Sequence, residues 1–122
     1  MKKILLYSYS KCSTCRKAIN FLKENNISFE LRDIVVNPPS KRILKLALAK
    51  IGKEKKRLFN TRGKSFRDSK IIDIESLSDE RIVNILYSDG KFIKRPFLII
   101  ENKEFIFGFN EVEYIKYLSI SS

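Results

Sequence analysis

Apolar side chains near the start of the chain are arranged first as a strand and then as one face of a helix. Residues 3–9, KILLYSY, are rich in strand-forming side chains and predict a buried first strand that stops at Ser10-Lys11. After this strand, a helix is predicted to begin at Ser13, a residue that can cap, with apolar positions at Cys15, Ala18, Ile19 and Leu22. Asn25-Asn26 is expected to end this helix with a left-handed residue.

The next stretch alternates and then returns to a helical spacing. Ile27–Val36 alternates apolar and polar side chains over its first half, which predicts a second strand, and Asn37-Pro38-Pro39 ends it. Ser40 is expected to open a helix that Gly52 closes. The buried face of this helix is predicted to carry Leu44, Ala47, Leu48 and Ile51.

A further helix is expected after Ser76 or Ser78, ending at Asp89-Gly90. Its apolar stripe would consist of Ile82, Ile85 and Leu86. The middle of the chain is therefore predicted to be helical.

The last third changes period again. The runs PFLII and EFIF flank a short polar turn, Glu101–Lys103, and predict a hairpin. Asn110 with Glu113 three residues later is an N-cap signature for a closing helix, whose apolar face would carry Val112, Ile115 and Leu118. The predicted order is β-α-β, a helical middle, then β-β-α, in one α/β domain over residues 1–122.

The composition, 43% hydrophobic and 32% charged residues in a chain of 122, is that of one soluble globular domain. No apolar run approaches the ~18 residues that span a membrane, and the apolar stretch after the basic start is too short for a signal-peptide core. We therefore expect a cytoplasmic protein with no membrane partner. Thiols stay reduced in that compartment, so a cysteine pair there is typically catalytic, redox-sensing or metal-binding.

The formal net charge of +11 suggests an anionic partner. The densest basic run, Lys50–Arg57, lacks the interleaved aromatic side chains of a nucleic-acid surface, and no nucleic-acid-binding module is recognisable. We expect most of the charge to be solvated and no direct contact with nucleic acid. Small oxyanions and acidic protein partners remain open.

The two cysteines, Cys12 and Cys15, lie three residues apart where the first strand gives way to the helix. Zinc needs about four ligands, and with no histidine and no third cysteine the chain is expected to hold no metal. A disulfide across so short a loop stabilises little by chain entropy. Cys15 lies on the apolar face and fits an ordinary buried thiol, whereas Cys12 lies in the loop before the helix.

The position of Cys12 favours a reactive thiol. A thiolate there would face unpaired backbone N–H groups and the positive end of the helix dipole, with Lys11 and Arg16 close by. Because the thiolate is the nucleophile, Cys12 should attack a disulfide, an oxyanion adduct or an oxidant, and Cys15 can then resolve the intermediate as a disulfide.

Four separated motifs follow one another in the chain: YSKCSTCRKA, LFNTRGKSFR, KRPFLII and GFNE. With the β-α-β start, they make the chain similar to the arsenate reductase (ArsC)/Spx family over nearly its whole length. The resemblance implies a thioredoxin-like (glutaredoxin-like) mixed sheet, with a helical insertion at about residues 40–90 between the βαβ and ββα halves. It also implies a cis peptide bond before Pro96.

The same resemblance implies roles for three side chains. Cys12 matches the family's nucleophile, and Arg62 in NTRG and Arg95 in KRP match two arginines that hold the oxyanion in arsenate reductases. A guanidinium offers planar, paired donors that suit an oxyanion or the carboxylate of a thiol substrate such as glutathione.

Three positions depart from glutathione-dependent arsenate reductases. The third arginine of that group is replaced by the Gly108-Phe109 region, a serine is replaced by Cys15, and a histidine before the loop is replaced by Ser8. We therefore expect weak or absent activity on arsenate itself. The second cysteine makes the chain more similar to the Spx-type regulators, in which a CxxC motif is a redox switch.

Two functions follow from the resemblance. One is an arsenate reductase-like thiol–disulfide oxidoreductase, a monomer with no bound cofactor, taking a small oxyanion or disulfide as substrate and glutathione/glutaredoxin or thioredoxin as electron donor. The alternative is a Spx-type redox-regulated transcriptional regulator that binds the C-terminal domain of the RNA polymerase α subunit.

Overall fold

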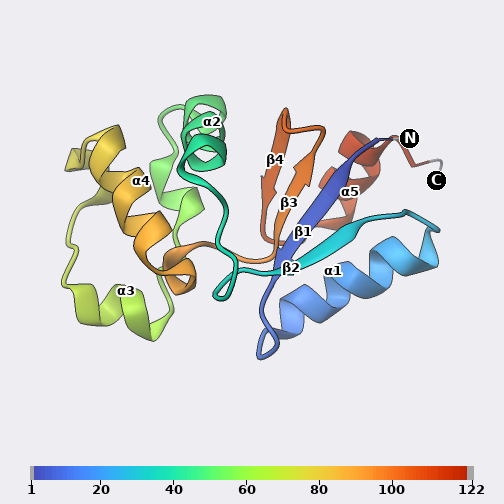
Figure 1. The fold of residues 1–122 in the computed structure, drawn as a ribbon, viewed down its shortest axis with the longest axis horizontal. Coiled ribbons are helices and arrows are strands. Elements are labelled where there is room, and N and C mark those ends of the chain that lie inside the picture. The colour runs from blue at the N-terminus through green and yellow to red at the C-terminus, as the bar shows by residue number, and fades with distance from the viewer. Residues whose placement is uncertain (1, 121–122) are drawn as a thin grey trace. The chain divides into compact units, whose positions relative to one another are not determined.

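The computed structural model describes residues 2–120, which form two compact units (Figure 1). The sheet unit consists of residues 2–33 and 95–120, and the helical unit of residues 34–94. The expectation of one domain over residues 1–122 stays a prediction. Among the described residues, no helix has both the length and the apolar character that crossing a membrane requires.

The sheet unit is built on four strands in the order β2-β1-β3-β4. Strand β1 (Ile4–Ser8) pairs parallel with β2 (Glu30–Asp33) and antiparallel with β3 (Phe97–Ile100), which pairs antiparallel with β4 (Glu104–Phe107). The sheet is therefore mixed, with a βαβ half, a ββα half and helices between them in the sequence. This confirms the fold class predicted from the sequence.

Helices α1 (Ser13–Glu24) and α5 (Glu111–Leu118) pack on one face of this sheet (Figure 1). The alternation of β1 and β3 places every second side chain on that face. The resulting core contains Ile4, Leu6, Ala18, Phe21, Leu22, Leu98, Ile100, Ile106, Tyr114 and Leu118.

Turns in the sheet unit follow the sequence signals closely. Asn26 has a φ of 56°, which confirms the left-handed stop after α1. The hairpin turn places Glu101 and Asn102 in the same left-handed region, each with a φ of 55°. The turn is thus fixed by two consecutive left-handed residues, although neither is glycine.

Two expectations for this unit are wrong in detail. The strand predicted over Ile27–Val36 pairs only over Glu30–Asp33, because the residues after Asp33 form a turn. In α5, Leu118 is buried and Ile115 packs against the core as predicted, but Val112 is exposed and Tyr114 is buried in addition. The Tyr114 ring meets Phe21 and Phe109, an aromatic contact that aliphatic periodicity does not reveal.

The helical unit packs α2 (Lys41–Ile51) against α4 (Asp79–Ser88). Both helices begin as predicted, with Ser40 and Ser78 accepting backbone N–H bonds as N-caps, and α2 ends at Gly52. The buried positions are Leu44, Ala47, Leu48, Ile82, Val83 and Leu86.

Short elements complete this unit. They are α3 (Lys64–Ser69) and three 3₁₀ turns, η1 (Lys55–Leu58), η2 (Ile74–Ser76) and η3 (Gly90–Phe92). A Cβ atom on Gly90 would lie 1.8 Å from the carbonyl oxygen of Ile34, so only glycine fits where the two ends of the unit meet.

Candidate functional site

Cys12 lies at the N-terminus of α1, just beyond the end of β1. Its backbone is extended, with a φ of −107° and a ψ of 111°, and its N–H donates to the carbonyl oxygen of Tyr9 over 3.1 Å. The Sγ atom accepts the N–H of Cys15 over 3.2 Å. Cys12 therefore caps the helix itself, and the expectation that Ser13 is the cap is wrong, because Ser13 is already the first helical residue.

The two thiols differ sharply in environment. Both are free, but Cys12 is half-buried, whereas Cys15 is only 1% exposed. Burial raises the pKa of Cys15 to about 12, assisted by a hydrogen bond to the Cys12 side chain and opposed by the Tyr9 backbone and the charge of Arg95. At neutral pH the Cys15 thiol keeps its proton, so the more accessible Cys12 is the candidate for first attack.

Strand pairing brings the segment Arg95-Pro96 to the same end of the sheet as the cysteines. Tyr7 at the end of β1 is opposite Phe97 at the start of β3, so the residues just beyond them are neighbours. The Arg95-Pro96 peptide bond is cis, the geometry that the resemblance implies. The carbonyl oxygen of Pro96 accepts the N–H of Gly108 over 2.8 Å.

Arg95 is held close to the loop that precedes Cys12. Its guanidinium carbon lies 4.8 Å from the centre of the Tyr9 ring, a cation–π distance. Farther along the loop, Nη1 of Arg16 donates to the carbonyl oxygen of Ser10 over 3.2 Å. Two cationic side chains are therefore bound to the segment that carries the thiol.

Arg62 belongs to the helical unit, where it is exposed in the loop before α3. The proposed pairing of Arg62 with Cys12 stays a prediction.

Two tyrosines near the site, Tyr9 and Tyr114, were not predicted from the sequence. Tyr9 had only its place after the first strand as a signal, and its partner Arg95 is distant in sequence. Tyr114 is fully buried, and its hydroxyl donates to the carbonyl oxygen of Gly108 over 3.4 Å. Burial, and secondarily Cys15, raise the pKa of Tyr114 well above its usual range.

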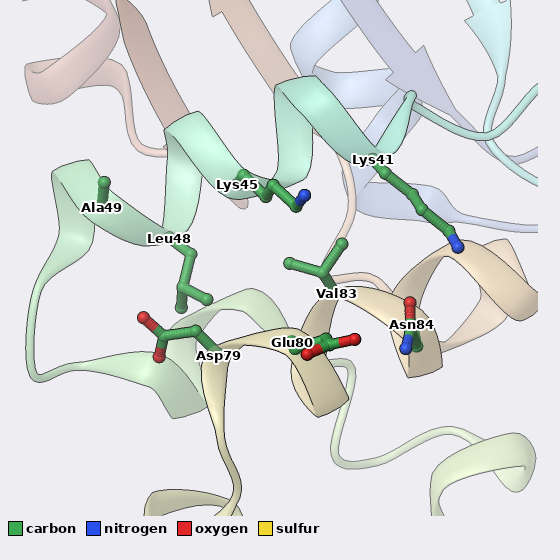
Figure 2. Close-up of a pocket in the computed structure, with 8 residues that line it drawn as sticks. All are labelled: Lys41, Lys45, Leu48, Ala49, Asp79, Glu80, Val83 and Asn84. Carbon is green, nitrogen blue, oxygen red and sulfur yellow. The ribbon is translucent and has the colours of Figure 1, made fainter.

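A separate pocket of about 440 Å³ lies in the helical unit between α2 and α4 (Figure 2). Leu48 and Val83 give it apolar walls, Lys41 and Lys45 come from α2, and Glu80 comes from α4. Both cysteines lie outside residues 34–94, so this pocket supplies no thiol of its own.

Within residues 2–120, His, Cys, Asp and Glu side chains nowhere form a group of three or more that could hold an ion.

The chain is similar to a known protein family and to several named proteins. The ArsC family model matches residues 7–117. Uncharacterized protein YusI of Bacillus subtilis is 35% identical over 91% of this chain and 94% of its own length. Global transcriptional regulator Spx 2 of Bacillus anthracis is 31% identical over 94% of this chain and 86% of its own length.

Among solved structures, a possible arsenate reductase from Streptococcus mutans UA159 is 37% identical. It matches with a TM-score of 0.85 over 90% of this chain and 93% of its own.

Proposed function

Because the chain belongs to the ArsC family, we propose that it is a cytoplasmic thiol–disulfide oxidoreductase of the arsenate reductase type. Cys12 is the nucleophile and Cys15 the resolving thiol. One observation carries the proposal: the Cys12 sulfur caps α1 by accepting the Cys15 N–H, which sets an accessible sulfur at a helix N-terminus directly before a second, buried thiol.

The first step is attack by the Cys12 thiolate on one sulfur of a substrate disulfide. A bond forms between Cys12 Sγ and that sulfur, the substrate S–S bond breaks, and the other half leaves as a thiolate that takes up a proton. The Cys15 N–H at the start of α1 donates to the Cys12 sulfur and holds it at the helix N-terminus.

The second step uses Cys15. Its thiol gives up a proton to solvent, and the sulfur attacks Cys12 Sγ, displacing the second substrate half and leaving a Cys12–Cys15 disulfide. The two protein thiols have then supplied both electrons. Reduction by glutathione/glutaredoxin or by thioredoxin restores them, and no bound cofactor is needed.

Arg95 supplies positive charge for the substrate in this scheme. A half-buried guanidinium beside the thiol loop suits a carboxylate or an oxyanion, and Arg62 is the second proposed contact. We expect little turnover of arsenate, because the third arginine of the glutathione-dependent reductases has no counterpart in the Gly108-Phe109 region.

Turnover assays test the proposal directly. Arsenate and a glutathione mixed disulfide are offered as substrates, with glutathione/glutaredoxin or thioredoxin as donor. Mixed-disulfide turnover that disappears in Cys12→Ser and slows in Cys15→Ser is the expected result. Absence of turnover with every donor, or full activity of Cys12→Ser, would overturn it.

A regulator is the alternative, and the names of relatives such as Spx 2 favour it. The same pair of free thiols would then act as a redox switch, with the C-terminal domain of the RNA polymerase α subunit as partner. Binding of that domain by the oxidised but not the reduced protein, together with no turnover, would select the regulator.

A further inference from the structure

Tyr9 and Arg95 form a cation–π contact in which the ring can hold the Arg95 guanidinium in place. The guanidinium carbon is 4.8 Å from the ring centre, well inside the roughly 6 Å reach of a cation–π interaction. Both side chains are partly buried, which strengthens such a contact relative to one in open water.

The backbone of each partner is anchored independently. Tyr9 accepts the Cys12 N–H through its carbonyl oxygen. Arg95 precedes Pro96, whose carbonyl oxygen accepts the Gly108 N–H. The backbone at Tyr9 and the backbone next to Arg95 are thus held by separate hydrogen bonds, and the cation–π contact orients the long, flexible side chain of Arg95.

The arginine is chemically suited to an anion. Its guanidinium lies over the Tyr9 ring, and a guanidinium carries planar, paired N–H donors that match a carboxylate. The charge of Arg95 also lowers the pKa of Cys15 against the effect of burial, so this charge acts on the buried thiol of the pair.

We propose that Tyr9 is a positioning residue that holds the Arg95 guanidinium beside the thiol pair and thereby gives the site its preference for negatively charged disulfides. The inference rests on the proposed thiol–disulfide chemistry, and it adds the substrate class and the residue that sets it. Tyr9 acts through Arg95 and takes no part in bond making.

The test measures one thiol–disulfide exchange and requires no electron donor. Reduced full-length protein reacts with dithiobis(nitrobenzoate), which carries two carboxylates, and with dithiodipyridine, which is uncharged at neutral pH. The ratio of the two rate constants, anionic over neutral, is determined for the wild type, Tyr9→Leu, Tyr9→Phe and Arg95→Met. The rate with the neutral reagent reports whether the thiol site is intact in each variant.

Tyr9→Leu should lower the ratio about two- to fivefold, the effect of losing one cation–π contact. Tyr9→Phe keeps the ring face and should retain a ratio close to the wild type. In an Arg95→Met background, Tyr9→Leu should change nothing further, because the two residues act as a unit.

An unchanged ratio in Tyr9→Leu would overturn the proposal, as would an equal effect of Tyr9→Leu with and without Arg95. A loss in Tyr9→Phe as large as in Tyr9→Leu would show that the hydroxyl, not the ring face, matters.

Should Tyr9→Leu not fold, NMR of the wild type decides, because an aromatic ring next to the guanidinium shifts the Arg95 side-chain protons upfield. Failure of the proposed enzyme would show as absent catalytic turnover while this single-exchange ratio still responds to Tyr9.

Discussion

At the scale of single residues, the site is defined by a contrast between two neighbouring thiols. Cys12 is half-buried and caps α1, whereas Cys15 is 1% exposed and lies on the inward face of the same helix. Burial therefore separates two residues that are chemically identical in the sequence. The order of reaction predicted below is based on this contrast.

Alkylation by iodoacetamide at neutral pH should modify Cys12 well before Cys15. Burial both blocks access to Cys15 and raises its pKa to about 12, so little reactive thiolate is present there. Peptide mapping at successive times measures the order. Cys15→Ala should leave the fast phase unchanged and Cys12→Ser should remove it, whereas earlier labelling of Cys15 would contradict the assignment.

Stability should fall at alkaline pH in a manner that depends on Cys15. Its pKa is raised from the ordinary 9.0 to about 12 in the folded protein, so above pH 9 the unfolded chain releases a proton that the folded chain retains. Unfolding is then favoured by about 1.4 kcal/mol per pH unit until roughly pH 12. The raised pKa of Tyr114 acts in the same direction.

Urea unfolding between pH 8 and 11 under reducing conditions measures this slope. Cys15→Ala should flatten it by about 1.4 kcal/mol per pH unit, and Cys12→Ser, which keeps the buried thiol, should not. Equal slopes in the wild type and Cys15→Ala would show that the Cys15 proton is not retained on folding.

The sequence identified the candidate site residues that carry their own signal, but not those defined by distant partners. Cys12 and Cys15 were predictable because strand, loop and helix positions can be assigned from local periodicity. Tyr9 and Tyr114 were not, since the contact of Tyr9 is with Arg95 and one ring contact of Tyr114 is with Phe21, both far away along the chain.

At the scale of elements, long periodic segments were predicted well and short ones were missed. The limits of α2 and α4 agree with their serine caps and apolar stripes. Helix α3 has only six residues, no side-chain cap and no buried residue, so it leaves no periodic pattern to detect. Its form depends on contacts elsewhere in the unit, such as the hydrogen bond from Ser65 Oγ to Asp89 over 3.1 Å.

Gly90→Ala should destabilise the helical unit by about 2 kcal/mol or more. The new methyl group would overlap the carbonyl oxygen of Ile34, a backbone atom that cannot move without shifting the start of the unit. Thermal and urea unfolding measure the loss.

Gly63→Ala is the matched control for this prediction. Its new Cβ would lie 2.6 Å from the Asn60 amide nitrogen, the end of a side chain that can rotate away. We expect a change below about 1 kcal/mol. Similar losses for both variants would show that the contact with Ile34 is not the cause.

At the scale of the whole molecule, positive charge is unevenly distributed along the chain. Of the 25 Lys and Arg, fifteen lie within residues 34–94 against seven Asp and Glu, so this segment carries +8 of the net +11. A field of that sign raises the local concentration of anions and speeds their encounter with the protein.

Salt should therefore slow the reaction of the thiols with an anionic disulfide but not with a neutral one. Between about 0.01 M and 1 M salt the Debye length falls from about 30 Å to 3 Å, and we expect a severalfold decrease in rate for dithiobis(nitrobenzoate). Dithiodipyridine provides the matched uncharged control. Parallel salt dependence for the two reagents would indicate that salt acts on the thiols rather than on the encounter.

The hydrogen bond from the Cys15 amide to the Cys12 sulfur should make the NMR signal of this amide sensitive to the oxidation state of Cys12. A thiolate accepts this proton strongly, and a sulfur already bonded to a second sulfur accepts it weakly, so the resonance position and the solvent exchange of one amide follow the chemical state of Cys12. Isotope-labelled protein titrated against a glutathione buffer would then yield a midpoint potential from a single NMR signal, with no dye, tag or substituted residue.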